Sequence, residues 1–414
     1  MLEAKTERIR KDIETMAGFT ATPGKGMTRF SFSKEDRLTR DYIASEMKGA
    51  GLTVFEDAAG NLFGRREGTV PGAPAVMIGS HFDSVKNGGA FDGPAGVVMG
   101  LEIARVLHEN GIASEHPLEF AALVEEEGAR FGGGLYGSRA MTGKVTREAL
   151  DTFKDRDGVS AAEAMKDFGF DPDKIGEAVR PEGSLKAFIE MHIEQGPILE
   201  SSGTDLGLVK TIVGISQRDV EILGRPDHAG TTPMDMRRNA LVAAAEAVLF
   251  LDRAAKEAAG GTVGTVGRME VFPGGTNIVP GRVFFTIDVR SVYLEKIEQV
   301  TGSFAAFLKE LEKKHGVTIS VTDKLTVRPV EMSEEILNLF REEAAKRGYS
   351  SKVMQSGAGH DAMIMASATD VGLVFVPSKG GRSHCPDEWT DYGQIKKGVD
   401  VVLGAVLSLA KARV

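Results

Sequence analysis

The sequence predicts an α/β protein: a domain built on a mostly parallel sheet, with a second domain of the ferredoxin-like α+β kind inserted into it. Three observations support this fold class. Short apolar runs alternate with helical patterns in both end regions of the chain, which is typical of a parallel sheet covered by helices. A different order of elements occupies the middle of the chain. The length of 414 residues is more than one ordinary core requires and favours two domains.

Four apolar runs are interpreted as buried strands, and polar residues follow each of them. In open α/β sheets, the carboxyl ends of parallel strands form the edge where ligands bind. Residues far apart in the sequence are therefore expected to meet at that edge. The runs are Ala75–Gly79, which leads to His81; Leu118–Val124, which leads to three glutamates; Leu185–Met191, which leads to His192; and Val371–Val376, which precedes a loop with His384.

The middle of the chain predicts the order β-α-β-β-α-β, which is the ferredoxin-like arrangement. We interpret residues 213–326 as a domain inserted into the first one, which then comprises residues 1–212 and 327–414. The two crossings between the domains would be natural hinges. The predicted elements are a strand at Arg218–Leu223, a helix at Asn239–Ala259, strands at Thr265–Phe272 and Val283–Arg290, a helix at Leu294–His315 and a strand at Val317–Thr322.

Composition and charge limit the partners of the chain. The chain has 50 basic and 59 acidic residues, a net charge of −9, and no basic block, which argues against nucleic acid or an anionic membrane as a partner. No apolar run is long enough to span a bilayer, and the charged start lacks the apolar segment of a signal peptide. The single cysteine, Cys385, excludes an intramolecular disulfide and fits a reducing cytoplasm.

His81 and Asp92 flank a glycine-rich segment, GSHFDSVKNGGAFDG, that can fold back and bring both side chains to one point. Imidazole and carboxylate groups are natural ligands of zinc and manganese. Asp83 follows closely and could orient the ring of His81 as an outer carboxylate. A solvated turn after a strand is the alternative explanation of this segment.

Three consecutive acids, Glu125, Glu126 and Glu127, follow a predicted buried strand. Like charges this close are costly unless a cation or solvent offsets them. A metal site would give them separate roles, one as a ligand and one as the base that takes a proton from an activated water. An acidic, solvated strand end is the alternative. Because His192 and His384 add two nitrogen donors at equivalent strand ends, the four segments together predict a site for two divalent metal ions.

Eight segments, in their order along the chain, resemble one group of enzymes. From about residue 20 to the C-terminus the chain is similar to the N-carbamoyl-L-amino-acid hydrolases, the allantoate amidohydrolases and the β-ureidopropionases. This group belongs to the wider aminoacylase/carboxypeptidase class of dinuclear zinc enzymes. The segments are GSHFDS…GGAFDG, EEEGARF, HIEQGP, DHAGTTPM, GGTNIVPG, DVRS, SGAGHDAM and SHCPDEW, of which HIEQGP and SGAGHDAM are far more specific than a lone HxD.

The resemblance implies a role for each matching residue. Asp92 would bridge the two ions, Glu126 would be the general base, and Asp83 would stand behind His81. His192 occupies a position where the wider class commonly has an acid, which favours the carbamoylase group over the peptidases. Residues 213–326 would form a lid and the interface of a homodimer. The implied metal ligands are His81, Asp92, Glu127, His192 and His384, and the implied substrate-binding residues are Gln195, His228, Asn277, Arg290 and His360.

Three of these substrate residues also have explanations that need no substrate. His228 could stabilise the oxyanion of a tetrahedral intermediate, or it could be a loop histidine on the surface. Arg290 ends the segment FTIDVR, where its guanidinium could hold a substrate carboxylate or pair with Asp288. Asn277, in PGGTNIVPG, could be a turn residue or part of a loop that approaches a ligand closely.

Taken together, the residues and the resemblance predict metal-dependent hydrolysis of a carbamoyl (ureido) C–N bond in a small carboxylate-bearing substrate. An N-carbamoyl-L-amino acid would give the amino acid, carbon dioxide and ammonia. Two ions per chain are expected, zinc or manganese, with cobalt and nickel as further candidates. The alternatives are an allantoate amidohydrolase, an exopeptidase or deacylase of the same class, and a non-catalytic protein with structural metals. The presence of both Glu126 and Glu127 argues against the last of these.

Overall fold

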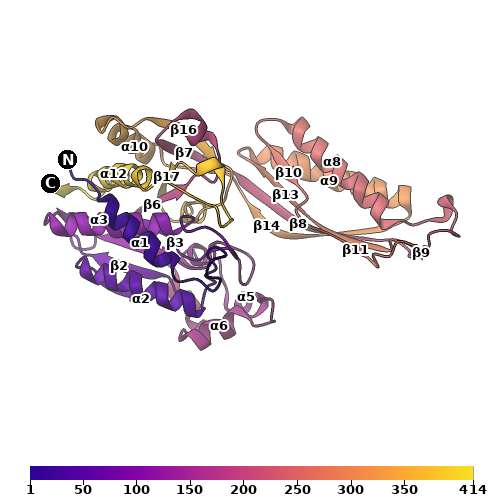
Figure 1. Cartoon of the computed structure of the whole chain (residues 1–414), viewed down its shortest axis with the longest axis horizontal. Coiled ribbons are helices and arrows are strands. Elements are labelled where there is room, and N and C mark those ends of the chain that lie inside the picture. The colour runs from indigo at the N-terminus through magenta and orange to yellow at the C-terminus, as the bar shows by residue number, and fades with distance from the viewer. Residues whose placement is uncertain (414) are drawn as a thin grey trace. The chain divides into compact units, whose positions relative to one another are not determined.

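The computed structural model describes residues 1–413 and divides the chain into two compact units (Figure 1). The first unit comprises Met1–Lys210, Glu331–Ser356 and His360–Val414. The second comprises Thr211–Val330 and the short segment Gly357–Gly359. Each unit has a hydrophobic core of its own.

The first unit is built on a nine-stranded sheet in which four neighbouring strands are parallel. From the sequence we expected a mostly parallel sheet, and the structure has a parallel centre of four strands with antiparallel pairs on both sides of it. The pairs β1–β2, β2–β5 and β17–β7 are antiparallel. In spatial order the parallel strands are β5 (Leu118–Leu123), β3 (Ala75–His81), β6 (Leu185–Ile193) and β17 (Asp370–Val376); the flanking strands are β1 (Thr53–Glu56), β2 (Leu62–Arg66), β7 (Leu206–Ile212), β15 (Val330–Glu331) and β16 (Ser351–Ser356).

The parallel strands are buried because helices cover them. Every residue of β3 and of β5 is buried, which explains why neither strand alternates between apolar and exposed polar residues. Helix α3 packs on β3, β5 and β6, while α12 packs on β6 and β17 and also contacts α1, α3 and α10 (Figure 1). The helices of this unit are α1 (Thr6–Ala17), α2 (Lys34–Gly49), α3 (Pro94–Glu109), α4 (Tyr136–Met141), α5 (Arg147–Thr152), α6 (Ala161–Phe168), α7 (Ile198–Ser202), α10 (Glu334–Lys346), α11 (Asp361–Met365) and α12 (Tyr392–Leu409).

The second unit has an antiparallel sheet with two long helices packed along it (Figure 1). The strand order β14-β8-β13-β10, with β11 also paired to β13, is the ferredoxin-like order. The single strand expected at residues 265–272 is instead two short strands, β10 and β11, on the same neighbour. The elements are β8 (Gly214–Leu223), α8 (Ala240–Ala258), β10 (Val263–Thr265), β11 (Met269–Phe272), β13 (Arg282–Ser291), α9 (Leu294–His315) and β14 (Thr318–Val327).

Strand β13 shows why this sheet has one helix-covered and one open face. Its residues alternate between buried and more exposed positions, and the buried ones, such as Phe285 and Ile287, belong to the core under the helices. Helix α8 begins where the side chain of Asn239 accepts hydrogen bonds from the backbone N–H groups of Leu241 and Val242. Two very short strands, β9 (Asp227–His228) and β12 (Ile278–Val279), pair with each other outside the main sheet.

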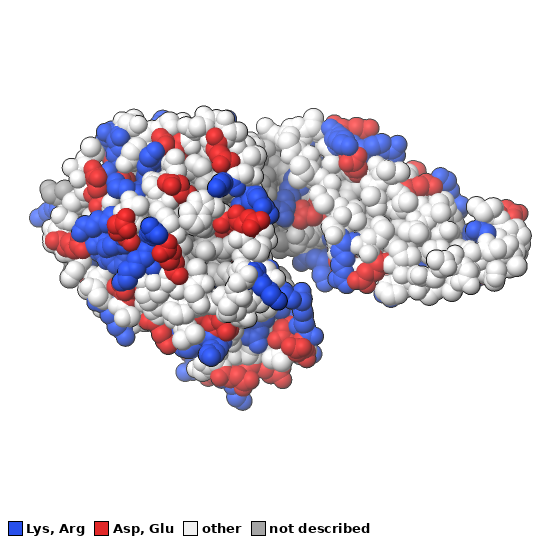
Figure 2. Space-filling model, viewed as in Figure 1, with Lys and Arg blue, Asp and Glu red and all other residues white. Residues whose placement is uncertain are grey.

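The surface carries both signs of charge. On the face seen in Figure 2, acidic and basic residues are interspersed, and the blue group on the left is bordered by red residues. Among residues 1–413, no helix has the length and hydrophobicity that crossing a membrane requires.

Candidate active site

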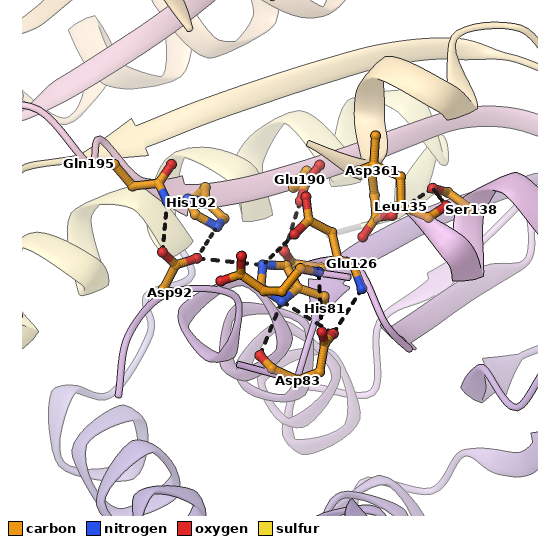
Figure 3. Close-up of polar contacts among 12 residues, drawn as sticks. His81, Asp83, Asp92, Glu126, Leu135, Ser138, Glu190, His192, Gln195 and Asp361 are labelled. Atoms are coloured by element: carbon orange, nitrogen blue, oxygen red, sulfur yellow. Dashed lines mark hydrogen bonds and ion pairs between the residues drawn. The ribbon is translucent and has the colours of Figure 1, made fainter. Parts of the chain in front are cut away.

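The first unit brings the candidate metal ligands together at the carboxyl ends of its parallel strands. His81 is the last residue of β3, and His192 lies near the end of β6. Glu127 follows β5, and His384 lies in the loop between β17 and α12. Asp92 lies in the loop between β3 and α3 (Figure 3). The parallel register explains the convergence, because it aligns His81 with Leu123 of β5 and His192 with Phe375 of β17.

Asp92 is shared by two groups of potential ligands. His81, Asp92 and His192 form one group, and Asp92, Glu127 and His384 form the other. The Oδ1 atom of Asp92 lies 3.0 Å from Nε2 of His192 and 3.6 Å from Nε2 of His81. Its Oδ2 atom lies 3.4 Å from Nε2 of His384, which is itself 3.2 Å from Oε1 of Glu127. Each oxygen of the carboxylate therefore faces a different group, as a bridging ligand requires.

The donor chemistry of these groups fits divalent cations. Imidazole nitrogens and carboxylate oxygens are ligands that suit zinc and manganese. Hydrogen bonding to Asp92 and Glu127 raises the pKa of His384 to about 11. This shift reflects an excess of negative charge, which a cation bound between these side chains would neutralise.

The backbone at Gly93 allows the Asp92 loop to pass close to His81. Gly93 has a φ of +81°, and a Cβ atom there would collide with the imidazole ring of His81. Pro94 then occupies the first turn of α3, where its missing N–H costs nothing. The sequence Asp-Gly-Pro thus places the carboxylate of Asp92 beside the histidines and starts the helix immediately afterwards.

Asp83 connects the histidine of one strand to the acids of the next. Its Oδ1 and Oδ2 atoms accept hydrogen bonds from the backbone N–H groups of Glu126 (3.0 Å) and Glu127 (3.2 Å). Its carboxylate also lies 3.6 Å from Nδ1 of His81. The ring of His192 is oriented in a similar way, because its Nδ1 lies 2.9 Å from the carbonyl oxygen of Ile193. In both histidines Nε2 is the nitrogen that faces Asp92.

The three consecutive acids have different environments. The carboxylate of Glu125 is buried and accepts hydrogen bonds from the backbone N–H groups of Arg130 and Phe131, so it holds its own loop. Glu127 belongs to a ligand group. Glu126 belongs to neither group, and its Oε2 atom lies 3.7 Å from Nε2 of His81. Burial raises the pKa of Glu126, and the negative charge of Glu127 adds to the shift, while His81 opposes it.

Gln195 and Ser383 both donate hydrogen bonds to the shared ligand. The Nε2 atom of Gln195 lies 2.7 Å from Oδ2 of Asp92, and the hydroxyl oxygen of Ser383 lies 2.5 Å from the same atom. The side chain of Gln195 therefore faces a candidate metal ligand, and its contact with substrate stays a prediction. Ser383 was not expected from the sequence, although its place directly before His384 is a signal that could have indicated it.

His360 is buried beside His192, and their ring centres are 4.6 Å apart. Its Nε2 atom lies 2.9 Å from the hydroxyl oxygen of Ser356. Burial lowers the pKa of His360, and the positive charge of His192 adds to this effect. A neutral imidazole is therefore expected at this position, next to the candidate ligands.

The second unit carries the other three predicted substrate residues. His228 is exposed, and its Nδ1 atom accepts hydrogen bonds from the backbone N–H groups of Gly230 and Thr231, which leaves the proton on Nε2. Asn277 is also exposed. Arg290 donates from Nε and Nη2 to the two carboxylate oxygens of Asp288 at 2.8 and 3.0 Å, and from Nη1 to the carbonyl oxygen of Gly357.

Known proteins resemble this chain over almost its whole length. Residues 69–408 match peptidase family M20/M25/M40. The N-carbamoyl-L-amino-acid amidohydrolases of Paenarthrobacter aurescens and Geobacillus stearothermophilus are 47% and 41% identical, with 98% of each chain covered. The allantoate amidohydrolase of Bacillus subtilis is 35% identical over 96% of both chains. Among solved structures, AtUAH in complex with glyoxylate superposes with a TM-score of 0.90 at 33% identity and 99% coverage of both chains.

Proposed function

The chain belongs to peptidase family M20/M25/M40, and we propose that it hydrolyses the carbamoyl C–N bond of N-carbamoyl-L-amino acids with the help of two divalent metal ions. The observation that carries this proposal is the pair of ligand groups that share Asp92, with Glu126 next to them but in neither group. The names and the identity of the relatives support the choice of substrate.

His81, Asp92, Glu127, His192 and His384 would hold the ions, with zinc or manganese favoured and cobalt or nickel as further candidates. Metal ions bound there would polarise the ureido oxygen and make water acidic enough to be a nucleophile at neutral pH. The role of Asp83 and of the carbonyl oxygen of Ile193 is to keep the two histidine rings oriented toward Asp92.

Glu126 is the proposed general base. Its carboxylate takes the proton of the attacking water and later delivers it to the leaving nitrogen. Hydrolysis releases the amino acid and a carbamate, which decomposes to carbon dioxide and ammonia. His228 is proposed to donate its Nε2 proton to the oxyanion of the tetrahedral intermediate, since its Nδ1 atom is already an acceptor.

Substrate recognition is assigned to Gln195, Asn277, Arg290 and His360 as a proposal. Asp288 occupies the Nε–Nη2 edge of Arg290, and the carbonyl oxygen of Gly357 accepts from Nη1. The outer edge, formed by Nη1 and Nη2, is therefore the one proposed to face the substrate carboxylate. We also propose that residues 213–326 act as a lid and mediate a homodimer, and the single cysteine, Cys385, supports a cytoplasmic location.

An ammonia-release assay tests the proposal. The protein is treated with a chelator, reloaded with zinc, manganese, cobalt or nickel, and offered N-carbamoyl-L-amino acids beside a panel of dipeptides. Metal-dependent ammonia release from the ureido compounds is expected, with no cleavage of the dipeptides. Full activity of the chelator-treated protein, or cleavage of the dipeptides alone, would overturn the proposal.

Allantoate is the second candidate substrate, because the allantoate amidohydrolase of Bacillus subtilis is also a relative over nearly the full length. It contains the same kind of ureido bond and a carboxylate. Its inclusion in the assay separates the two candidates by their kcat/KM values. A higher kcat/KM for allantoate than for every N-carbamoyl-L-amino acid tested would assign the chain to ureide breakdown.

A further inference from the structure

Glu388 is a buried carboxylate that the proposed reaction does not use. It lies in the loop between β17 and α12, shortly after His384, and only 5% of its surface is exposed. Among residues 1–413, no lysine, arginine or histidine forms an ion pair with it. A buried carboxylate without a cation needs hydrogen-bond donors to offset the loss of hydration.

The donors come from the loop of Asp92 and from Ser383. The Oε1 atom of Glu388 accepts hydrogen bonds from the backbone N–H groups of Phe91 (2.9 Å) and Asp92 (3.0 Å). Its Oε2 atom lies 2.9 Å from the hydroxyl oxygen of Ser383, which is also 2.5 Å from Oδ2 of Asp92. Glu388 therefore holds the backbone of Asp92 directly and reaches its side chain through one shared hydroxyl.

The residue type at position 89 agrees with this contact. A Cβ atom added to Gly89 would collide with the side chain of Glu388, from its Cβ to its carboxylate. Gly89 is not among the glycines with a positive φ angle, so a left-handed backbone is not the reason for this glycine. The close approach of Glu388 is therefore the reason that the structure gives for a glycine at this position.

We propose that Glu388 is a positioning residue that fixes Asp92 in the orientation shared by the two ligand groups and thereby sets the affinity for metal. Asp92 is the only member common to both groups, so a small rotation of its loop would disturb both. Glu388 holds this loop through the two hydrogen bonds that its Oε1 atom accepts from the backbone N–H groups of Phe91 and Asp92. Ser383 has a single hydroxyl proton, which can serve only one of the two carboxylates beside it. Methionine has nearly the length of glutamate but no oxygen, so both backbone N–H groups would lose their acceptor. This inference rests on the metal centre of the proposed function.

The affinity for metal is the direct test. Zinc and manganese are titrated into the unmodified protein and into Glu388→Met, with a chromophoric chelator as competitor and with circular dichroism as a check of folding. The variant is expected to bind both ions about 10- to 100-fold more weakly, the usual effect of losing a partner behind the ligands. An affinity within twofold of the unmodified protein would overturn the inference. If the unmodified protein bound neither ion, the metal centre itself would be refuted, and with it the proposed function.

A second variant reaches the same contact from the other side. Gly89→Ala keeps every polar group but displaces Glu388, and it is expected to weaken metal binding in the same direction. When it is added to Glu388→Met, the further loss should be small, because both changes act on one interaction. Fully additive losses would mean that the glycine acts by another route, which would contradict the proposed role of Glu388.

Glu343 and Gly404 supply a matched control pair in the same unit. Glu343 is also buried, on α10, and a Cβ atom at Gly404 of α12 would collide with its carboxylate. Glu343→Met and Gly404→Ala therefore repeat both chemical changes away from the candidate ligands. They are expected to lower the free energy of unfolding and to leave the affinity for metal unchanged. If they weakened metal binding as strongly as the variants at 388 and 89, the effect would be a general loss of stability and the inference would fail.

Discussion

Two neighbouring carboxylates with separate functions give the sharpest test of the site. Glu127 lies 3.2 Å from His384 and belongs to a ligand group, whereas Glu126 belongs to neither group. Glutamine has nearly the shape of glutamate, and both backbone N–H groups would keep their hydrogen bonds to Asp83. Glu126→Gln and Glu127→Gln therefore remove one negative charge each from adjacent positions, with little other change.

The expected losses differ in kind. In Glu126→Gln, the loss of proton transfer should lower kcat by about 10²–10⁴-fold, or roughly 3–5 kcal/mol in the activation barrier, with the bound metal unchanged. In Glu127→Gln, an anionic ligand is lost, so metal affinity should fall by more than the roughly 10- to 100-fold typical of partners behind the ligands. Elemental analysis after dialysis and the ammonia-release rate separate the two results. Near-normal turnover by Glu126→Gln, or equal metal content in both variants with equal loss of rate, would refute the assignment.

Three further changes test other contacts of the site. Asp83→Asn leaves one side-chain oxygen where two now accept backbone N–H groups, so metal affinity is expected to fall about 10- to 100-fold. An unchanged affinity in a chelator competition would contradict the proposal that Asp83 orients the ring of His81. In Arg290→Lys, the lysine cannot keep the contact with Asp288 and also reach the substrate. The value of kcat/KM should fall at least tenfold, since a charged hydrogen bond contributes about 1.5–3 kcal/mol. If the unmodified protein cleaved a substrate and its carboxamide equally well, the role of Arg290 would be structural. Burial raises the pKa of Asp361 to about 7, and the charge of Glu190 adds to the shift, so the folded state keeps a proton that the unfolded chain loses above about pH 4. The contribution of Asp361 to the free energy of unfolding should therefore fall as the pH rises from about 4 to 7, and Asp361→Asn should remove at least about 1.4 kcal/mol of pH dependence in urea unfolding with chelator present. An identical pH dependence would show that Asp361 titrates normally.

The sequence predicted best the helices with a long periodic pattern of apolar residues and the strands that are completely buried. Helix α9 has the bounds expected from its apolar spacing, Leu294–His315, and the core strand β5 ends within a residue of the expected run. The direction of the flanking strands was not predictable. Strands β1 and β2 are short and carry no signal that distinguishes parallel from antiparallel pairing.

The sequence predicted those residues of the site that lie at the ends of buried strands. His81, His192 and the acids after β5 follow apolar runs, so their convergence could be expected from the rules of parallel sheets alone. The hydrogen bonds between loops could not be predicted in this way. Glu388 contacts Asp92 from a position far along the chain, and only the folded conformation of both loops shows that its partners are backbone N–H groups. A sequence pattern contains no information on such a partner.

The candidate ligands lie far apart along the chain, so the two ligand groups are synthesised at different times. His81, Asp92 and His192 lie on the earlier part of the polypeptide, and the whole second unit separates them from His384. Roughly 190 residues must be added in between, which takes about 10–40 s at 5–20 residues per second. The first half of the centre is thus translated before the second half has its final ligand. In the proposed metal centre, the group of His81, Asp92 and His192 is therefore complete in the nascent chain first, and the group with His384 forms only when β17 has joined the sheet beside β6.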